Sequence, residues 1–248
     1  MRALLSLVLI LVSAAPLRAA VWIVDAAGGG DFTDLPAAVA AAAPGDRLLV
    51  RDGSYRGARV TRGLHLIASS TTPLVELESP LMIEDLPVNE RVLVRGIGFR
   101  SCVFGLSVVR CAGAVTIEEM RMSLLCAVFV PPSGMTSTAP VLRIVDCAPV
   151  ILRGCSFPGS RASSGRDFPG AEIVRSTVWM YDVVIFGVSG AACAGQVGGL
   201  GLRASQSSVL LSGCRILGGS GSSGGACFQL DPPCYHADGG EACDAPGT

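Results

Sequence analysis

Five segments in the middle of the chain share one pattern of apolar and polar positions. They begin at Val92, Val115, Val150, Val178 and Val209, and the positions two, five and seven residues later are also apolar in every segment. Side chains at alternate positions of a β-strand share one face. Each segment therefore predicts two short strands, separated by a small polar corner three and four residues after the valine. A helix would instead need apolar residues at three- and four-residue spacing.

The spacing of the five segments predicts the fold class. Their first residues follow one another at intervals of 23 to 35 residues, and a supersecondary unit repeated at such intervals is typical of a solenoid. The tight Asn-Gly or Asp-Gly turns of a hairpin meander are absent between the units. An alanine-rich segment at residues 35–43 precedes the repeats. We predict an all-β fold, a right-handed, single-stranded parallel β-helix with a short N-terminal capping helix.

The longer intervals contain extra residues at one point of the repeat, at 131–140, 158–170 and 187–199. Each follows the second strand of its unit, so the three loops are expected to emerge on one side of the solenoid. Loops on a rigid scaffold often carry binding residues. Arg161, Arg166 and Asp167 are therefore candidate ligand-binding residues, and solvated charges on a tolerated insertion are the alternative.

The first residues of the chain predict export. A short basic start is followed by a weakly polar-to-apolar stretch at residues 3–15, which is too short to span a bilayer and stay there. Leu17-Arg18-Ala19 and Ser13-Ala14-Ala15 could each supply the cleavage signal, and Pro16 directly after the second favours the first. We expect an extracytoplasmic protein that is secreted, periplasmic or attached to the cell surface.

Composition divides the chain into three parts: residues 1–19 as signal peptide, 20–217 as the β-helix domain, and 218–248 as a Gly/Ser linker followed by a cysteine-containing tail. The tail carries Cys227, Cys234 and Cys243 and has too little apolar content for a core of its own. Two interpretations stay open for it: a cap on the open end of the solenoid, or a disordered end.

The charge balance excludes one class of partner. Without Arg2 and Arg18 of the signal peptide, 17 basic residues face 20 acidic ones, a net charge of −3. Nucleic-acid binding requires clustered positive charge, so it is not expected. No second apolar run reaches membrane-spanning length, so we expect no integral membrane segment after removal of the signal peptide.

The ten cysteines all follow residue 100, and export would allow them to form disulfides. By the register of the repeats, Cys102 and Cys126 lie on adjacent coils, and so do Cys111 and Cys147. Adjacent-coil spacing falls within the Cα range of a disulfide. We therefore predict the bonds Cys102–Cys126 and Cys111–Cys147.

Two further cysteines are expected to stay reduced. Cys155 and Cys214 share a repeat position but have Val183 between them, so they should be buried thiols. No Cys-x-x-Cys pair occurs, and His65 and His236 lie far apart. A bound metal is therefore not predicted from these residues.

The stretch from residue 21 to 57 resembles the opening of the pectin-lyase-like superfamily of β-helix proteins, and it is similar above all to pectinesterases and related secreted repeat proteins. The matching residues are Gly30-Asp31-Phe32-Thr33, Ala37-Ala38-Val39, Pro44-Gly45-Asp46 and Gly53-Ser54-Tyr55. They cover less than a fifth of the chain and form a turn, a cap helix and a first-coil corner. The resemblance implies the parallel β-helix fold.

Pectinesterases of this superfamily use two aspartates, a glutamine and an arginine in a cleft of the sheet. The segment from Tyr181 to Gly187 resembles their D-F-I-F-G motif, with Asp182 one residue further from Phe186 than in the family. That offset is expected to turn the carboxylate to another face of the strand. The family's Q-D-T-L-like and L-G-R-P-W-like motifs are missing.

Polysaccharide lyases of the superfamily combine an acidic calcium cluster with a basic residue. The nearest equivalent here is Glu118 and Glu119 with Asp182, and Arg95, Arg121 and Arg153 are the basic residues near by. Glu119 and Asp182 should lie two coils, about 10 Å, apart, which is too far to chelate one Ca²⁺ without loop ligands. The competing interpretation places Arg95, Glu118 and Arg153 in an alternating charge ladder across successive coils.

Trp179 occupies an outward position of the repeat and is a candidate for stacking on sugar rings. We expect an exported β-helix repeat protein that binds polysaccharide or forms a cell-surface scaffold without catalysis and without a cofactor. The alternative is a polysaccharide lyase or carbohydrate esterase acting on polyuronates such as pectin. In that case Asp182, Glu119 and Arg153 would be catalytic, and a lyase could require Ca²⁺.

Overall fold

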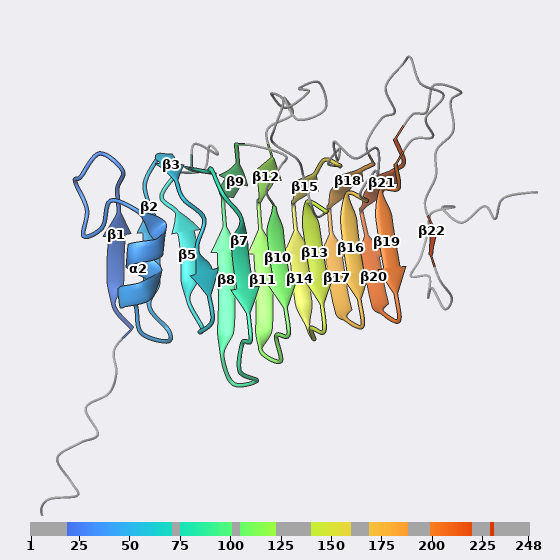
Figure 1. Ribbon diagram of the computed structural model, residues 1–248, viewed down its shortest axis with the longest axis horizontal. Coiled ribbons are helices and arrows are strands. Elements are labelled where there is room, and N and C mark those ends of the chain that lie inside the picture. The colour runs from blue at the N-terminus through green and yellow to red at the C-terminus, as the bar shows by residue number, and fades with distance from the viewer. Residues whose placement is uncertain are drawn as a thin grey trace, which may run out of the picture.

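The protein is a parallel β-helix, as a computed structural model of the chain shows (Figure 1). The structure describes residues 19–70, 75–100, 105–122, 140–159, 169–187, 199–219 and 229–230. Strands in these ranges form three sheets, and every strand pair is parallel. The chain passes from sheet A to sheet B to sheet C in each coil and then begins the next coil in sheet A. The predicted fold class is confirmed.

Each sheet gathers equivalent strands of successive coils. Sheet A contains β1 (Val21–Val24), β2 (Arg47–Val50), β5 (His65–Ala68), β8 (Arg91–Arg95), β11 (Ala114–Glu118), β14 (Val150–Arg153), β17 (Thr177–Tyr181) and β20 (Ser208–Ser212). Sheet B contains β3 (Gly53–Tyr55), β6 (Val75–Leu77), β9 (Ile97–Phe99), β12 (Arg121–Met122), β15 (Ser156–Phe157), β18 (Val184–Phe186) and β21 (Arg215–Leu217). Sheet C contains β4 (Arg59–Val60), β7 (Leu81–Glu84), β10 (Leu106–Val109), β13 (Leu142–Val145), β16 (Ala171–Val174), β19 (Leu202–Ser205) and β22 (Gln229–Leu230).

A short helix, α2 (Leu35–Ala41), covers the N-terminal end of the solenoid (Figure 1). The Asp34 side chain caps it by accepting a hydrogen bond from the backbone N–H of Leu35 at 2.9 Å. The helix buries Leu35, Ala38 and Val39 and contacts β1, β2 and β4. It ends two residues before the predicted boundary, because Ala42 has extended backbone angles. The predicted capping helix is confirmed.

The predicted register is the register of sheets A and B. The five aligned valines pair with one another in sequence across β8, β11, β14, β17 and β20. In the first four segments, all sixteen aligned positions are no more than 4% exposed. The four positions of the last segment are half-buried against the same core: Val209, Leu211, Cys214 and Ile216. Within the described ranges no strand of sheet A or B follows β20 or β21, so these two strands have a paired neighbour on one side only among the described residues.

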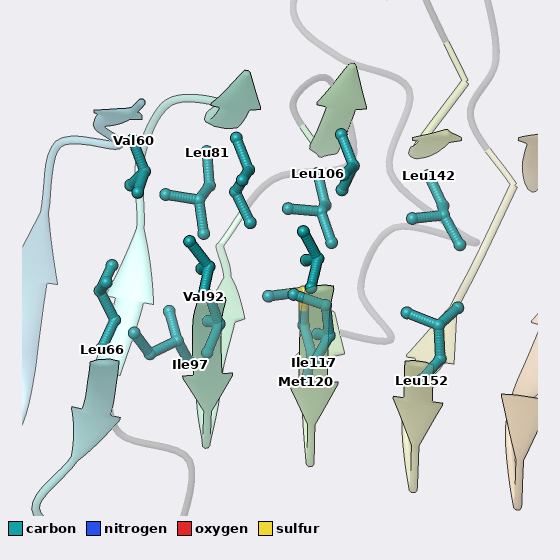
Figure 2. Close-up of a cluster of buried hydrophobic side chains, with 14 of the residues drawn as sticks. Val60, Leu66, Leu81, Val92, Ile97, Leu106, Ile117, Met120, Leu142 and Leu152 are labelled. Atoms are coloured by element: carbon teal, nitrogen blue, oxygen red, sulfur yellow. The ribbon is translucent and has the colours of Figure 1, made fainter. Parts of the chain in front are cut away.

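The interior is filled by stacked aliphatic side chains. In Figure 2, Leu66, Ile117 and Leu152 of sheet A lie on one side of the interior, and Leu81, Leu106 and Leu142 of sheet C lie on the other. Equivalent residues of successive coils stack at the strand spacing of about 4.8 Å, so each side chain packs against its counterparts above and below. This stacking explains why one apolar pattern recurs along the chain.

Two corners of the coil are built from residues with left-handed backbone. The A–B corner, between sheets A and B, contains Gly96, Glu119, Gly154, Asp182 and Gly213, all with positive φ. The C–A corner, between sheets C and A, contains Asp85, Arg110, Asp146, Arg175 and Gln206, again all with positive φ. This conformation is unusual for residues other than glycine. The small polar corner predicted after each first strand is the A–B corner.

The three predicted loops occupy equivalent places in the coil. They join sheet B to sheet C, between β12 and β13, between β15 and β16, and between β18 and β19. Their attachment points therefore follow the same strand of each coil. Most of their residues, including Arg161, Arg166 and Asp167, lie outside the described residues.

The predicted tail region contributes one described strand. Gln229 and Leu230 form β22, which continues sheet C by pairing with β19. Cys227, Cys234 and Cys243 lie outside the described residues. No helix in the described part of the chain has both the length and the apolar character needed to cross a membrane.

Candidate functional site

The outer face of sheet A carries two parallel rows of side chains. Because successive residues of a strand face opposite sides, alternate positions of each strand form these rows. Row one contains Val21, Arg47, His65, Leu93, Thr116, Ile151, Trp179 and Leu210. Row two contains Ile23, Leu49, Ile67, Arg95, Glu118, Arg153, Tyr181 and Ser212.

The second half of row one is a continuous, largely apolar stripe. Leu93, Ile151 and Leu210 are half-buried, and Trp179 is 39% exposed. Thr116 contributes its methyl group between Leu93 and Ile151. The stripe crosses five strands, so it is about 19 Å long at the usual strand spacing. Isolated surface apolar residues are common, whereas contiguous ones indicate an interaction surface.

The outward position predicted for Trp179 is confirmed, but the stripe around it was not recognised in the sequence. The signal was present, because Leu93, Ile151 and Leu210 each follow an aligned valine by one residue, as Trp179 does. Near the other end of row one, His65 lies between Arg47 and Leu93. Burial, together with the Arg47 charge, lowers the pKa of His65 below its usual range.

Row two contains the predicted charge ladder, with one difference. Glu118 pairs with Arg95 and Arg153 in the strand register, and a side-chain nitrogen of Arg153 lies 3.5 Å from a Glu118 oxygen. Arg95, however, directs its guanidinium to Glu119 at the A–B corner, at 3.1 Å. Arg153 also lies over the ring of Tyr181, 5.7 Å from the centroid, a cation–π geometry. The contribution of Tyr181 was not anticipated.

The three candidate catalytic residues are not brought together. Glu119 and Asp182 both lie at the A–B corner, exposed, with Gly154 of the intervening coil between them. A Cβ on Gly213 would meet Asp182 Oδ1 at 2.3 Å, so the Asp182 carboxylate lies against the coil on the side away from Glu119. Asp182 lies in the polar corner that the register predicted four residues after Val178, and it turns the chain there with φ 53°. Arg153 faces Glu118 and Tyr181.

The described residues also contain no cluster suited to a metal ion. Nowhere in these ranges do three or more His, Cys, Asp or Glu side chains lie in a ligating arrangement. Glu119 already contacts Arg95, and Asp182 is two coils away. The arrangement at the A–B corner is therefore one of separate surface carboxylates.

Cys111 and Cys147 are neighbours, as the register predicted, but the predicted bond is not formed: both are free thiols. The backbone N–H of Cys111 donates to Cys147 Sγ at 3.4 Å. Each sulfur is turned toward carbonyl oxygens: Cys147 Sγ lies 3.1 Å from the oxygen of Val145, and Cys111 Sγ lies 3.5 Å from the oxygens of Ile83 and Val109. The side-chain hydrogen bond between the two thiols, followed by burial, raises the pKa of the Cys147 thiol, and the backbone N–H of Cys111 opposes this shift.

The same inner position continues with hydroxyl groups in the next coils. Ser176 Oγ accepts from the N–H of Cys147 at 3.0 Å, and Ser207 Oγ accepts from the N–H of Ser176 at 3.1 Å. The two cysteines are thus the first members of a ladder of small polar side chains that satisfy backbone groups. The other predicted bond, Cys102–Cys126, lies outside the described residues.

Cys155 and Cys214 are both free thiols, as predicted. The predicted burial is confirmed for Cys155 but not for Cys214, which is half-buried because no strand of sheet A or B follows its coil within the described ranges. Val183 occupies the same position on the coil between them and is fully buried. Burial raises the pKa of the Cys155 thiol to about 11. Cys155 therefore does not resemble a reactive cysteine, which requires a lowered pKa and access to solvent.

A second charge ladder, missed in the sequence, follows the C–A corner. Arg110 makes two hydrogen bonds to Asp85, at 2.7 and 3.0 Å, and Arg175 makes two to Asp146, at 2.6 and 2.8 Å. These bonds hold the pKa values of both carboxyl groups below their usual range. Asp146 turns the chain with positive φ directly before Cys147. Its pairing could have been found by aligning the sheet C segments, because β7, β10, β13 and β16 are followed by Asp85, Arg110, Asp146 and Arg175.

Comparison with protein-family models, with curated proteins and with solved structures finds no match to this chain. The likeness to the pectin-lyase-like superfamily therefore depends on the opening residues and on the β-helix itself. The outer face of sheet A is the most distinctive surface of the described residues, because there an apolar stripe, two aromatic rings and alternating charges lie side by side.

Proposed function

We propose that the protein is an exported β-helix that binds a polysaccharide along the outer face of sheet A without cleaving it. The observation that carries the proposal is the apolar stripe from Leu93 to Leu210 beside the charges of row two. The stripe places Leu93, Thr116, Ile151, Trp179 and Leu210 at the same point of five successive coils. An extended polymer parallel to the solenoid axis would meet one of these side chains at each step of about 4.8 Å.

The side chains of this face suit a sugar polymer. Trp179 and Tyr181 lie on the same face of β17, two residues and about 7 Å apart. Flat aromatic rings offer a large apolar surface to the C–H faces of sugars while their polar groups stay wet. Arg95 and Arg153 in row two can donate charge-assisted hydrogen bonds to hydroxyl or carboxylate oxygens. Together these groups favour an acidic polysaccharide over a neutral one.

The positions of the acidic residues favour binding without turnover. General acid–base catalysis needs its groups within hydrogen-bond reach of the same reacting atoms. The Asp182 carboxylate lies against Gly213, whereas Glu119 contacts Arg95 on the opposite side of Gly154. A lyase or esterase would need these residues to converge, so the proposed protein is a binding module.

Membership of the pectin-lyase-like superfamily and a place outside the cytoplasm form part of the same proposal. The opening residues, the parallel coils and the capping helix support membership of the superfamily. The basic and apolar start of the chain supports a place outside the cytoplasm. An exported scaffold with a polymer-binding face would fit a protein that adheres to a cell wall or an extracellular matrix.

Calorimetric titration with polygalacturonate, alginate and a neutral glucan, with and without Ca²⁺, tests the proposal. We expect saturable binding of the acidic polymers and no release of product. Trp179→Ala should weaken binding about tenfold, the effect of losing roughly 1.4 kcal/mol. Leu217→Ala is the matched control, because Leu217 is 38% exposed against 39% for Trp179 but lies in sheet B.

Two results would overturn the proposal. Absence of binding to every polymer would exclude polysaccharide recognition by this face. Turnover that is abolished by Asp182→Ala or Glu119→Ala would show instead that the protein is a lyase or an esterase, and a requirement for Ca²⁺ would distinguish the lyase.

A further inference from the structure

Asp46 is a buried carboxylate in an otherwise apolar row. The residue lies directly before Arg47, so by the register of sheet A it stands opposite Leu64, which in turn stands opposite Val92. In every later coil the same inward position is a valine. Asp46 is only 4% exposed. An ionised carboxylate at such a position is costly unless charge and hydrogen bonds compensate it.

Three donors compensate Asp46, and none of them carries a charge in the uncut chain. The backbone N–H of Ala20 lies 2.7 Å from Oδ1, while Nε1 of Trp22 and the backbone N–H of Ala43 each lie 2.9 Å from Oδ2. Although burial opposes it, these hydrogen bonds hold the pKa of Asp46 below its usual range. No salt bridge to Asp46 occurs among the described residues. Within the part of the chain that the structure describes, the site therefore holds a negative charge without a positive partner.

Ala20 is also the first residue after the predicted signal peptide. Its carbonyl oxygen accepts from the backbone N–H of Arg47 at 2.8 Å, so both polar groups of its backbone are bound at the edge of sheet A. Ala19, in contrast, is exposed. If the peptide bond between Ala19 and Ala20 were cut, the new amino group would already lie at hydrogen-bond distance from the unpaired carboxylate.

We propose that the chain is cut between Ala19 and Ala20 by an endopeptidase of the signal-peptidase class, and that the resulting α-ammonium group of Ala20 forms a buried ion pair with Asp46. Water supplies the hydroxyl that joins the Ala19 carbonyl carbon and the hydrogen that joins the Ala20 nitrogen. At neutral pH the leader leaves with a carboxylate, and the new amine takes up one further proton. The inference rests on the proposed export of the protein.

The ion pair would link cleavage of the signal peptide to tighter anchoring of the N-terminal end of the solenoid. The Asp46 carboxylate accepts hydrogen bonds from Ala20 and Trp22, at the start of β1, and from Ala43, two residues after the end of α2. Cleavage converts the shortest of these contacts from a neutral donor into a charged one, and charge-assisted hydrogen bonds are about twice as strong. The mature chain is therefore expected to anchor β1 and the end of α2 more firmly than the precursor does.

The cut site is tested by producing the full chain with its leader in an exporting host and determining the N-terminus of the exported protein by mass spectrometry. We expect a protein that begins at Ala20. A different N-terminus, such as Pro16 after the alternative signal, would overturn the inference while leaving export intact. Retention of the whole chain in the cytoplasm would overturn the proposed export as well.

The ion pair is tested on purified protein that begins at Ala20, by nuclear magnetic resonance titration of its α-amino group. A free α-amine has a pKa of about 7.7 to 8.0, and pairing with Asp46 should raise it above that range. Asp46→Asn should return it to the ordinary value. An amine with an ordinary pKa in the Ala20 protein would overturn the pair, even if the cut site is correct.

Urea unfolding gives an independent measurement that does not need the Asp46 variant to fold. The comparison protein begins at Ala19 and so keeps a peptide N–H on Ala20. Because the folded-state pKa of the amine is raised, the pair stabilises fully below about pH 7.7 and is lost as the pH rises through the folded value. Between pH 7 and 10 the folding equilibrium constant of the Ala20 protein should fall about tenfold relative to the Ala19 protein, for each unit by which the pKa is raised. If the free energies of unfolding of the two proteins showed the same dependence on pH, the proposed ion pair would be wrong.

Discussion

The A–B corner and the C–A corner turn the chain in the same backbone conformation but fill it with different residues. At the A–B corner glycine alternates with an acidic residue, whereas at the C–A corner aspartate alternates with arginine before Gln206. Glycine adopts positive φ without strain, and other residues lose roughly 1–2 kcal/mol there. The C–A corner accepts this strain in five successive coils, from Asp85 to Gln206.

Side-chain pairing between coils accounts for the difference. At the C–A corner Arg110 reaches back to Asp85 and Arg175 to Asp146, each with two hydrogen bonds. At the A–B corner the glycines separate the acids, so Glu119 pairs with Arg95 in the neighbouring strand and Asp182 has no ion pair among the described residues. One corner is therefore held by its own side chains, and the other by its backbone and by the core beneath it.

The largest effect is expected in the core beneath the A–B corner. Met120 follows Glu119 and is fully buried, and Met120→Ala should lower the free energy of unfolding by about 2–5 kcal/mol. The corresponding residue after the C–A corner is Ser176, where alanine would leave the buried N–H of Cys147 without its acceptor, at a cost of about 1–3 kcal/mol. Urea unfolding of both variants measures the difference. A larger loss for Ser176→Ala would contradict the assignment of core support to the A–B corner.

A smaller effect is expected from the backbone of the A–B corner itself. Gly96 has φ +71°, and a Cβ there would lie 3.0 Å from Cβ of Ala68. Gly96→Val should therefore destabilise the protein by roughly 1–2 kcal/mol, measured by thermal and urea unfolding. Gly154→Asn is the control, because no atom lies within 4 Å of the added Cβ and asparagine tolerates positive φ. Equal losses of stability in the two variants would show that the positive φ of the corner and the space around Gly96 do not require glycine there.

The smallest effect is expected from the exposed ion pairs of the C–A corner. Asp146→Asn should lower stability slightly at neutral pH, because the hydrogen bonds from Arg175 hold the pKa of Asp146 below its usual range. This contribution is present above the unfolded pKa near 4 and is lost as the pH falls through the lower folded value. Wild type and variant should therefore converge in acid and in high salt.

Asp182→Asn provides the matched control at the other corner, because Asp182 also has positive φ but no ion pair among the described residues. Its stability difference from wild type should show no comparable dependence on salt. A salt dependence as large as that of Asp146→Asn would remove the distinction between the two corners.

Much of the architecture could be predicted from alternating apolar positions. The register of sheets A and B followed from the aligned valines, and the outward position of Trp179 followed from the same period. The repeat pattern did not extend to the strands of sheet C, because insertions of variable length separate them from the strands of sheet B. Its own segments are equally regular, and an independent alignment would have brought Asp85, Arg110, Asp146 and Arg175 into one line.

The candidate site was predicted less completely. Each surface side chain has a neighbour on the coil above and another on the coil below, about 4.8 Å away, and the register does not say which one it contacts. Arg95 contacts Glu119 rather than Glu118, and Asp182 lies against Gly213. The register made Cys111 and Cys147 neighbours, but it did not show that both would stay free thiols within hydrogen-bond distance of carbonyl oxygens.

The sequence by itself determined which side chains of sheets A and B face inward and which of their strands pair. The reason is that the alternation of apolar positions and the repeat can both be recognised from the order of residues along the chain. Only the tertiary structure decided which outward residues form a surface and which partner each charge selects. The stripe from Leu93 to Leu210 joins residues of five coils, and the contact of Ala20 with Asp46 joins the first strand to the coil that follows the helix. Both depend on side-chain rotamers and on neighbours that are distant in the chain. Such neighbours come together only when the coils stack.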